Sequence, residues 1–101
     1  MRVNIENQLF EWDDKKARLN KRKHGISFDT ATQVFFDENR VENYDDEHSG
    51  YEERWKIIGK VKEVLFVIYT ERGEAIRLIS ARKATPYERR IYYDNQEMDW
   101  S

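Results

Sequence analysis

The stretch VLFVIYT, residues 64–70, is the feature that most constrains what this chain can fold into. It is apolar on both faces of an extended strand, a pattern typical of a strand in the middle of a sheet. Further strand patterns lie on either side: WKIIGKV at residues 55–61, and AIRLISA at residues 75–81 after the tight turn ERGE. The three segments therefore predict an antiparallel meander with VLFVIYT as its central strand.

Two helices are expected before the meander. Asp13 is a suitable N-cap for DKKARLNKRKH, and Gly25 follows in the left-handed position that ends helices. This helix has few apolar residues, so we expect it to be largely exposed and basic. Ser27 caps a second helix, whose apolar residues recur at the spacing of a core-facing stripe: Phe28, Ala31, Val34 and Phe35.

A third helix is expected after the meander, where Thr85 and Glu88 match a capping box and Pro86 takes the first helical position. Weaker strand signals lie in QLFEW near the start and around residues 41–44, before a loop. The main elements run helix, helix, meander, helix. This order predicts an α+β fold, a curved antiparallel sheet with helices packed on one side.

The length of 101 residues predicts a single domain, over residues 1–93, followed by an acidic tail at residues 94–101. The chain has no cysteine, which excludes disulfides and thiol chemistry. No apolar run approaches the length of a membrane span, and the N-terminus lacks the apolar region of a signal peptide. We therefore expect a cytoplasmic protein with no membrane partner.

Charge is unevenly distributed along the chain, although the formal net charge is only -2. Residues 37–53 carry 1 basic and 8 acidic side chains, whereas residues 54–93 carry 10 basic and 4 acidic ones. Attraction to a polyanion depends on the local field more than on the total charge. The basic segment can therefore present a binding surface to a polyanion such as a nucleic acid.

His48 lies in a run that is dense in carboxylates, which suggests either acid/base catalysis or metal binding. Its acidic neighbours are Asp45, Asp46, Glu47, Glu52 and Glu53. Histidine is the side chain best suited to proton transfer near neutral pH. A metal site is disfavoured because calcium-loop spacing is absent and adjacent acids on a strand cannot all face one ion. The structural alternative is a surface histidine in a solvated loop.

Cations gather where the last strand meets the last helix, and antiparallel pairing lets several of them converge. They are Arg54, Arg72, Arg77, Arg82, Lys83, Arg89 and Arg90. Strict alternation along AIRLISA puts Arg77 and Arg82 on opposite faces of the strand. Arginine forks match phosphate oxygens and can stabilise charge that develops on phosphorus. Alternatively, Arg82 and Arg89 pair with acidic residues and only hold the sheet to the helix.

Aromatic residues near these cations offer stacking surfaces for bases, although aromatics at this density more often form cores: Trp55, Tyr69, Tyr87, Tyr92 and Tyr93. The sequence has no phosphate-binding glycine loop, dinucleotide fingerprint, zinc-ligand spacing or nucleophile elbow.

Taken in order, these segments resemble the BrnT-type toxins of bacterial type II toxin–antitoxin pairs, which look like compact RelE-like ribonucleases. The resemblance spans about residues 9–93 and rests on FEWDDKKARLNKRKHGISFDTATQVFFD, DDEHSGYEERW and YTERGEAIRLISARKATPYERRIYY. FDENRVENYDDEHS departs from the pattern because it lacks the proline that such sequences often place after the second helix. The acidic tail lies outside the resemblance.

The resemblance implies a RelE-like fold and metal-independent RNA cleavage without a cofactor, in which the attacking group is the substrate's own 2′-OH. It implies proton transfer by His48 or Glu52, and contact with the scissile phosphate by Arg54, Arg82 and Arg89. The implied RNA-binding residues are Tyr69, Arg72, Arg77 and Lys83.

The resemblance also implies a partner, a BrnA-like ribbon-helix-helix antitoxin in a 2:2 complex, and contact with operator DNA only through that antitoxin. Two alternatives remain. One is a binding module that acts as co-repressor with its antitoxin and does not cleave RNA. The other is a metal-dependent nuclease built on the cluster at residues 45–48.

Overall fold

The computed structural model describes residues 1–94, so the predicted acidic tail lies outside the described residues apart from Asp94. The elements are β1 (Arg2–Ile5), β2 (Gln8–Glu11), α1 (Asp14–His24), α2 (Phe28–Ala31), the 3-10 helix η1 (Thr32–Phe36), β3 (Val41–Tyr44), β4 (Trp55–Lys60), β5 (Val64–Arg72), β6 (Ala75–Lys83) and α3 (Pro86–Asp94). The α+β class is confirmed. No helix within the described range is long and apolar enough to cross a membrane.

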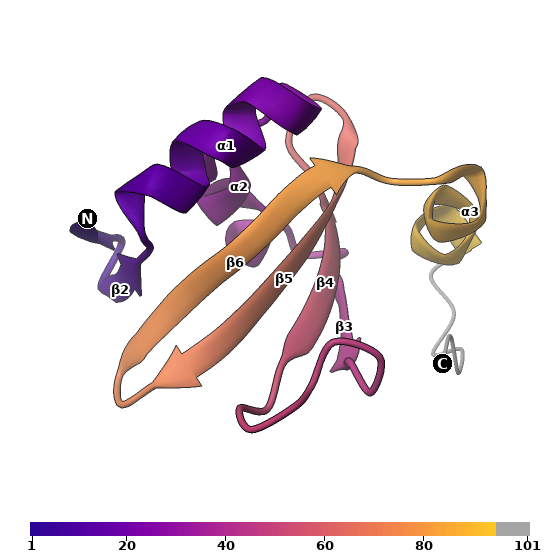
Figure 1. Ribbon diagram of the computed structural model, residues 1–101. Helices are drawn as coiled ribbons and strands as arrows, with labels where there is room; N and C mark the ends of the chain where they lie inside the picture. The colour runs from indigo at the N-terminus through magenta and orange to yellow at the C-terminus, as the bar shows by residue number, and fades with distance from the viewer. Residues whose placement is uncertain (95–101) are drawn as a thin grey trace.

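All the strands within the described range form one six-stranded sheet in the order β1-β2-β6-β5-β4-β3, shown in Figure 1. β4, β5 and β6 form the predicted antiparallel meander with β5 at its centre, and β3 pairs antiparallel with β4 as an edge strand. The expectation of a wholly antiparallel sheet is wrong, because β2 pairs with β6 in parallel.

A β-hairpin, not a helix, begins the fold. β1 pairs antiparallel with β2 across a turn in which Glu6 and Asn7 both have positive φ, at 48° and 69°. Two such residues make the kind of tight turn whose twist suits a hairpin. Asparagine tolerates positive φ, but glutamate rarely adopts it, so the sequence gives no strong signal for this turn.

The helices cover both faces of the sheet, which corrects the expectation that they pack on one side. α1, α2 and η1 cover one face, where Phe28 and Val34 meet Leu65 and Val67 of β5 in the larger core cluster. α3 packs on the other face, hereafter the α3 face, and shares a second cluster with Phe66. Figure 1 shows α1 and α3 on opposite sides of the strands.

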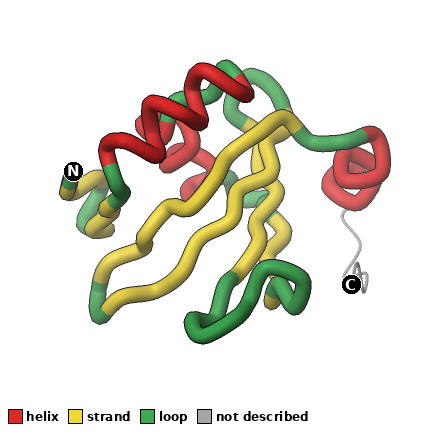
Figure 2. Tube along the Cα trace, in the orientation of Figure 1, coloured by secondary structure: helices red, strands yellow, loops and turns green. Residues whose placement is uncertain are grey.

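The α3 face is only partly covered by α3, which contacts β4 and β5 near one end of the sheet. The loop that joins β3 to β4 lies at the other end, drawn green in Figure 2. Strand, loop and helix residues can therefore meet on the α3 face between these two elements.

A β-bulge interrupts the pairing of β5 with β6. Ile68 pairs with Ser80, but the next residue of β5, Tyr69, pairs with Leu78. Ile79 is therefore an extra residue in β6. A single extra residue reverses which face the following side chains occupy.

The bulge places Arg77 and Arg82 on the same face of the sheet, whereas strict alternation predicts opposite faces. Arg82 pairs with Phe66, and Arg77 pairs with Thr70. Phe66 belongs to the α3-face cluster, and Thr70 lies four residues along the same strand, so it shares that face.

Candidate active site

A hollow of about 340 Å³ opens on the α3 face. Three segments far apart in the sequence line it: the β3–β4 loop, the strands of the meander, and the first turn of α3. Its lining residues are Asp45, Glu47, His48, Lys56, Phe66, Arg82, Tyr87 and Glu88. We call it the His48 hollow. It gathers acid/base groups, cations and aromatic rings in one place.

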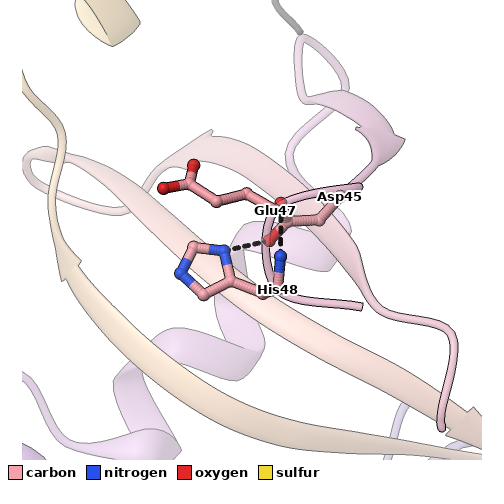
Figure 3. A group of neighbouring side chains, drawn as sticks. All are labelled: Asp45, Glu47 and His48. Carbon is pink, nitrogen blue, oxygen red and sulfur yellow. Dashed lines mark hydrogen bonds and ion pairs between the residues drawn. The ribbon is translucent and has the colours of Figure 1, made fainter. Parts of the chain in front are cut away.

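Asp45 holds His48 in a defined orientation. The Asp45 side chain is only 3% exposed, and its Oδ2 lies 2.6 Å from Nδ1 of His48, whose side chain is 44% exposed (Figure 3). An ionised carboxylate can only accept a hydrogen bond, so opposite it the neutral imidazole carries its proton on Nδ1. Nε2 points away from Asp45 and is the ring nitrogen that can exchange a proton in the hollow.

The backbone around this pair is tied down on both sides. Ser49 donates from its hydroxyl to the carbonyl of Asp45 at 2.7 Å, and it accepts from the Arg54 N–H at 2.9 Å. The N–H of Asp45 in turn donates to the Arg54 carbonyl at 2.9 Å. These bonds close the acidic stretch into a fixed loop, which is how residues 45–48 come to face the sheet.

Arg82 forms a two-pronged ion pair with Glu88. Its Nη1 and Nη2 donate to the two carboxylate oxygens of Glu88 at 2.8 and 3.0 Å. Its guanidinium carbon lies 4.1 Å from the centre of the Phe66 ring. Stacking on one side and pairing along one edge fix the plane of the guanidinium, and 34% of the side chain stays exposed.

Glu88 also closes the predicted capping box. Its carboxylate accepts from the Thr85 N–H at 2.8 Å, and the Thr85 hydroxyl accepts from the Glu88 N–H at 3.2 Å. Burial alone would raise the pKa of Glu88, but hydrogen bonds from Arg82 and Thr85 outweigh it and lower the pKa. Arg82 therefore joins strand to helix, as the structural alternative expects, and also lines the hollow.

Lys56 is a lining residue that sequence reasoning missed. It lies in β4 opposite Ile68, on the same face as Ile58. A lysine on an alternating strand is ordinarily interpreted as solvent-facing, so nothing in WKIIGKV distinguishes it from Lys60. Alternation places Lys56 and Lys60 on the same face as Ile58, and it is the position of the β3–β4 loop residues in the hollow that distinguishes Lys56.

The other residues predicted to act in catalysis lie outside the lining. Glu52 pairs with Arg72 at 3.0 Å, at the far end of β5. Arg89 donates to the Ala84 carbonyl at 3.2 Å, which ties α3 to the end of β6. The Nε of Arg54 is buried and has no hydrogen-bond partner within residues 1–94.

The predicted RNA-binding residues are also dispersed. Arg77 pairs with Glu11 at 2.8 Å, and Lys83 lies 3.5 Å from Glu63. Tyr69 is 6% exposed, packs in the larger core cluster and donates its hydroxyl to Glu42 at 2.8 Å. Burial, followed by the hydrogen bond to Glu42, raises the pKa of Tyr69 far above its usual range. A ring buried in this way offers little surface for a base, and the RNA-binding role of Tyr69 stays a prediction.

Asp45, Glu47 and His48 could also hold a metal ion, since one ligand atom from each lies within 4.8 Å of the others. Asp45 is buried, and the other two residues are exposed. This geometry keeps a metal-dependent reaction as an alternative to be tested.

A family model described as the ribonuclease toxin BrnT of type II toxin–antitoxin systems matches residues 12–88. The chain belongs to the BrnT family. The match includes every residue that lines the His48 hollow, from Asp45 to Glu88. This BrnT-family chain is thus a ribonuclease toxin of a type II toxin–antitoxin system, as the resemblance predicted.

A solved structure supports the same assignment. The ribonuclease toxin BrnT of Brucella abortus matches with a TM-score of 0.58 and 25% sequence identity. The match covers 75% of this chain and 95% of that one. No curated protein matches the sequence significantly.

Proposed function

We propose that this toxin is a metal-independent endoribonuclease, similar to RelE-type enzymes, that cleaves RNA in the His48 hollow. One observation carries the proposal: His48, whose free ring nitrogen is set by Asp45, shares a hollow with Lys56 and Arg82. A proton-transfer group beside fixed cations is what cleavage by the substrate's own 2′-OH requires.

In the proposed reaction the 2′-oxygen attacks the adjacent phosphorus as Nε2 of His48 removes its proton. The bond from phosphorus to the 5′-oxygen breaks, which leaves a 2′,3′-cyclic phosphate on one fragment and a 5′-hydroxyl on the other. The leaving 5′-oxygen takes up a proton, and the ammonium of Lys56 is the donor that we assign. Arg82 stabilises the charge that develops on the phosphate oxygens.

Asp45 acts through His48 and does not contact the substrate. Its carboxylate keeps the proton of the neutral imidazole on Nδ1, so that Nε2 is free to accept one.

The proposed partner is a BrnA-like ribbon-helix-helix antitoxin, in a 2:2 complex that reaches operator DNA only through the antitoxin. A free ribonuclease would harm its own cell, and the basic segment at residues 54–93 suits an acidic partner in the cytoplasm. Expression alone should arrest growth, and co-expression of the antitoxin should restore it.

The test compares the parent with His48→Ala and Arg82→Ala on a labelled single-stranded RNA, with and without chelator. His24→Ala and Arg90→Ala are the matched controls, because neither residue lines the hollow. We expect chelator-resistant cleavage by the parent and both controls, and losses of about 10²-fold or more in the other two. Loss of parent activity in chelator, restored by a divalent cation, would instead favour a metal site at residues 45–48.

A further inference from the structure

We propose that the ring of Tyr87 stacks on a nucleobase next to the scissile phosphate, so that the substrate is RNA with an unpaired base at that position. The inference rests on the proposed function and adds to it a base-binding subsite and a class of substrate.

The structure separates the tyrosines that the sequence groups together. Tyr69 and Tyr92 are each 6% exposed and belong to the two core clusters. Tyr93 is 60% exposed but borders another hollow, beside Lys60. Tyr87 is 49% exposed and lines the His48 hollow.

Tyr87 is held in place by its neighbours in the first turn of α3. Tyr87 lies between Thr85 and Glu88, the two residues of the capping box. The ion pair between Glu88 and Arg82 fixes this first turn of α3 against β6. The backbone that carries the ring is therefore fixed relative to the guanidinium that we assign to the phosphate. Only the side-chain torsions of Tyr87 remain to be ordered when a base binds, so little conformational entropy is lost.

The exposed ring has no evident role within the fold. Among residues 1–94, no hydrogen bond, ring contact or core cluster involves the Tyr87 side chain. Tyr87 is half exposed in a hollow that also holds Lys56 and Arg82. Proteins bind single-stranded nucleic acids in this way, with cations on the backbone and aromatic rings on the bases.

This arrangement favours an unpaired base. Every base has a flat face, so a ring alone binds with little sequence preference. In a duplex both faces of a base are covered by its neighbours, and the base must leave the stack before a ring can contact it. The substrate we infer is therefore single-stranded or looped RNA.

The experiment combines variants of Tyr87 with substrates that lack one base. The substrates are short labelled RNAs with one cleavable linkage, in which the nucleotide on either side is normal or abasic. Tyr87→Ala should lower kcat/KM on the normal RNA by about 5- to 150-fold, mainly through KM. Tyr87→Phe should stay within about twofold because it keeps the ring. Tyr93→Ala is the control from the same helix.

The decisive result is the coupling between ring and base. On the RNA that lacks the stacked base, Tyr87→Ala and the parent should cleave within about twofold of each other. An equal loss on both substrates would overturn the inference, as would a Phe variant as impaired as the Ala variant. Equal cleavage of a fully paired duplex would also overturn it.

A binding measurement separates this inference from the proposed function. A 2′-deoxy substitution at the cleavable position removes the attacking hydroxyl, so the affinity for intact RNA can be measured without cleavage. Tyr87→Ala should weaken binding of this probe by the same 5- to 150-fold or so, and the abasic probe should show no such difference. If the parent cleaves nothing, the proposed function fails, but the base subsite still stands or falls on these affinities.

Discussion

Truncation of Arg82 should reduce both stability and activity, because the side chain has a structural and a proposed catalytic role. Arg82→Ala removes both hydrogen bonds to Glu88, whose side chain is only 12% exposed, and the stacking on Phe66. A largely buried carboxylate deprived of its partner costs roughly 1 to 3 kcal/mol. For a domain of this size that lowers Tm by roughly 5 to 20 °C.

The catalytic loss should be larger than the structural one can explain. Losing one preorganised donor to a developing oxyanion lowers the rate by about 10² to 10³-fold. Single-turnover cleavage should be measured well below the Tm of the variant, where both proteins are folded. Glu88→Gln is the matched variant: it removes the same ion pair but leaves the arginine. We expect a comparable fall in Tm and cleavage within about tenfold of the parent.

Arg82→Lys gives an intermediate case, since lysine keeps the charge but loses the planar fork. Its rate should fall between those of the parent and Arg82→Ala. If Arg82→Ala loses stability yet cleaves within about threefold of the parent, Arg82 only joins β6 to α3. The assignment of this residue to the phosphate would then be abandoned.

Three further outcomes follow from single contacts. Asp45→Asn should lower kcat by about 10² to 10⁴-fold with a smaller effect on KM, because the amide favours the tautomer of His48 that carries its proton on Nε2. The ¹⁵N chemical shifts of the His48 ring should report this change of tautomer. Asp37→Asn should destabilise at neutral pH by roughly 1 to 3 kcal/mol in urea titrations, since this carboxylate accepts from Tyr92 and two backbone N–H groups. Gly59→Ala should cost roughly 1 to 3 kcal/mol or more, because its Cβ would lie 2.7 Å from that of Val34, and Gly50→Ala, in open space, is its control.

The pH dependence of Asp37 follows from the same contacts. Burial alone would raise the pKa of Asp37, but hydrogen bonds from Tyr92 and from the N–H groups of Lys60 and Asn39 outweigh it and lower the pKa below 3.8. The ionised form therefore stabilises the fold fully above about pH 4, and this contribution is lost as pH falls through the lower folded value. Asp37→Asn should have a flatter stability profile in that acid range, and an unchanged slope there would contradict the linkage.

Local signals in the sequence predicted most of the regular structure. The caps at Asp13, Ser27 and Thr85 all form, and Gly25 adopts the left-handed conformation expected at a helix end. The meander follows from turn residues and alternation, which act between neighbours in the chain. Each of these signals depends on a few neighbouring residues, so it can be recognised without knowledge of the tertiary fold.

The rest depends on contacts between distant segments. The bulge at Ile79 reverses the alternation that would have separated Arg77 from Arg82. No local residue pattern marks it. The side of the sheet on which α3 packs is likewise decided by the Phe66 face of β5 and not by the helix sequence.

The candidate site was predicted only in part for the same reason. His48 and Arg82 were recognised by chemistry, and the fold brings them together in one hollow. Nothing in the sequence singled out Asp45 among the acidic neighbours of His48. In the structure Asp45 is buried, and its carboxylate pairs with the His48 ring. Lys56 was missed, since only the pairing of β4 with β5 shows which face of the sheet it occupies.

The chemistry of the cleaved ends tests the central claim most directly. Purified toxin should be incubated in chelator with a short RNA, and its fragments analysed by mass spectrometry. Attack by the 2′-OH predicts a 2′,3′-cyclic phosphate and a 5′-hydroxyl, and no product when the nucleotide at the cleavage site carries 2′-hydrogen. Cleavage should also fall by about 10²-fold or more in His48→Ala. A 5′-phosphate product, or cleavage of the 2′-deoxy substrate, would mean that water attacks the phosphorus and would contradict the mechanism assigned to the His48 hollow.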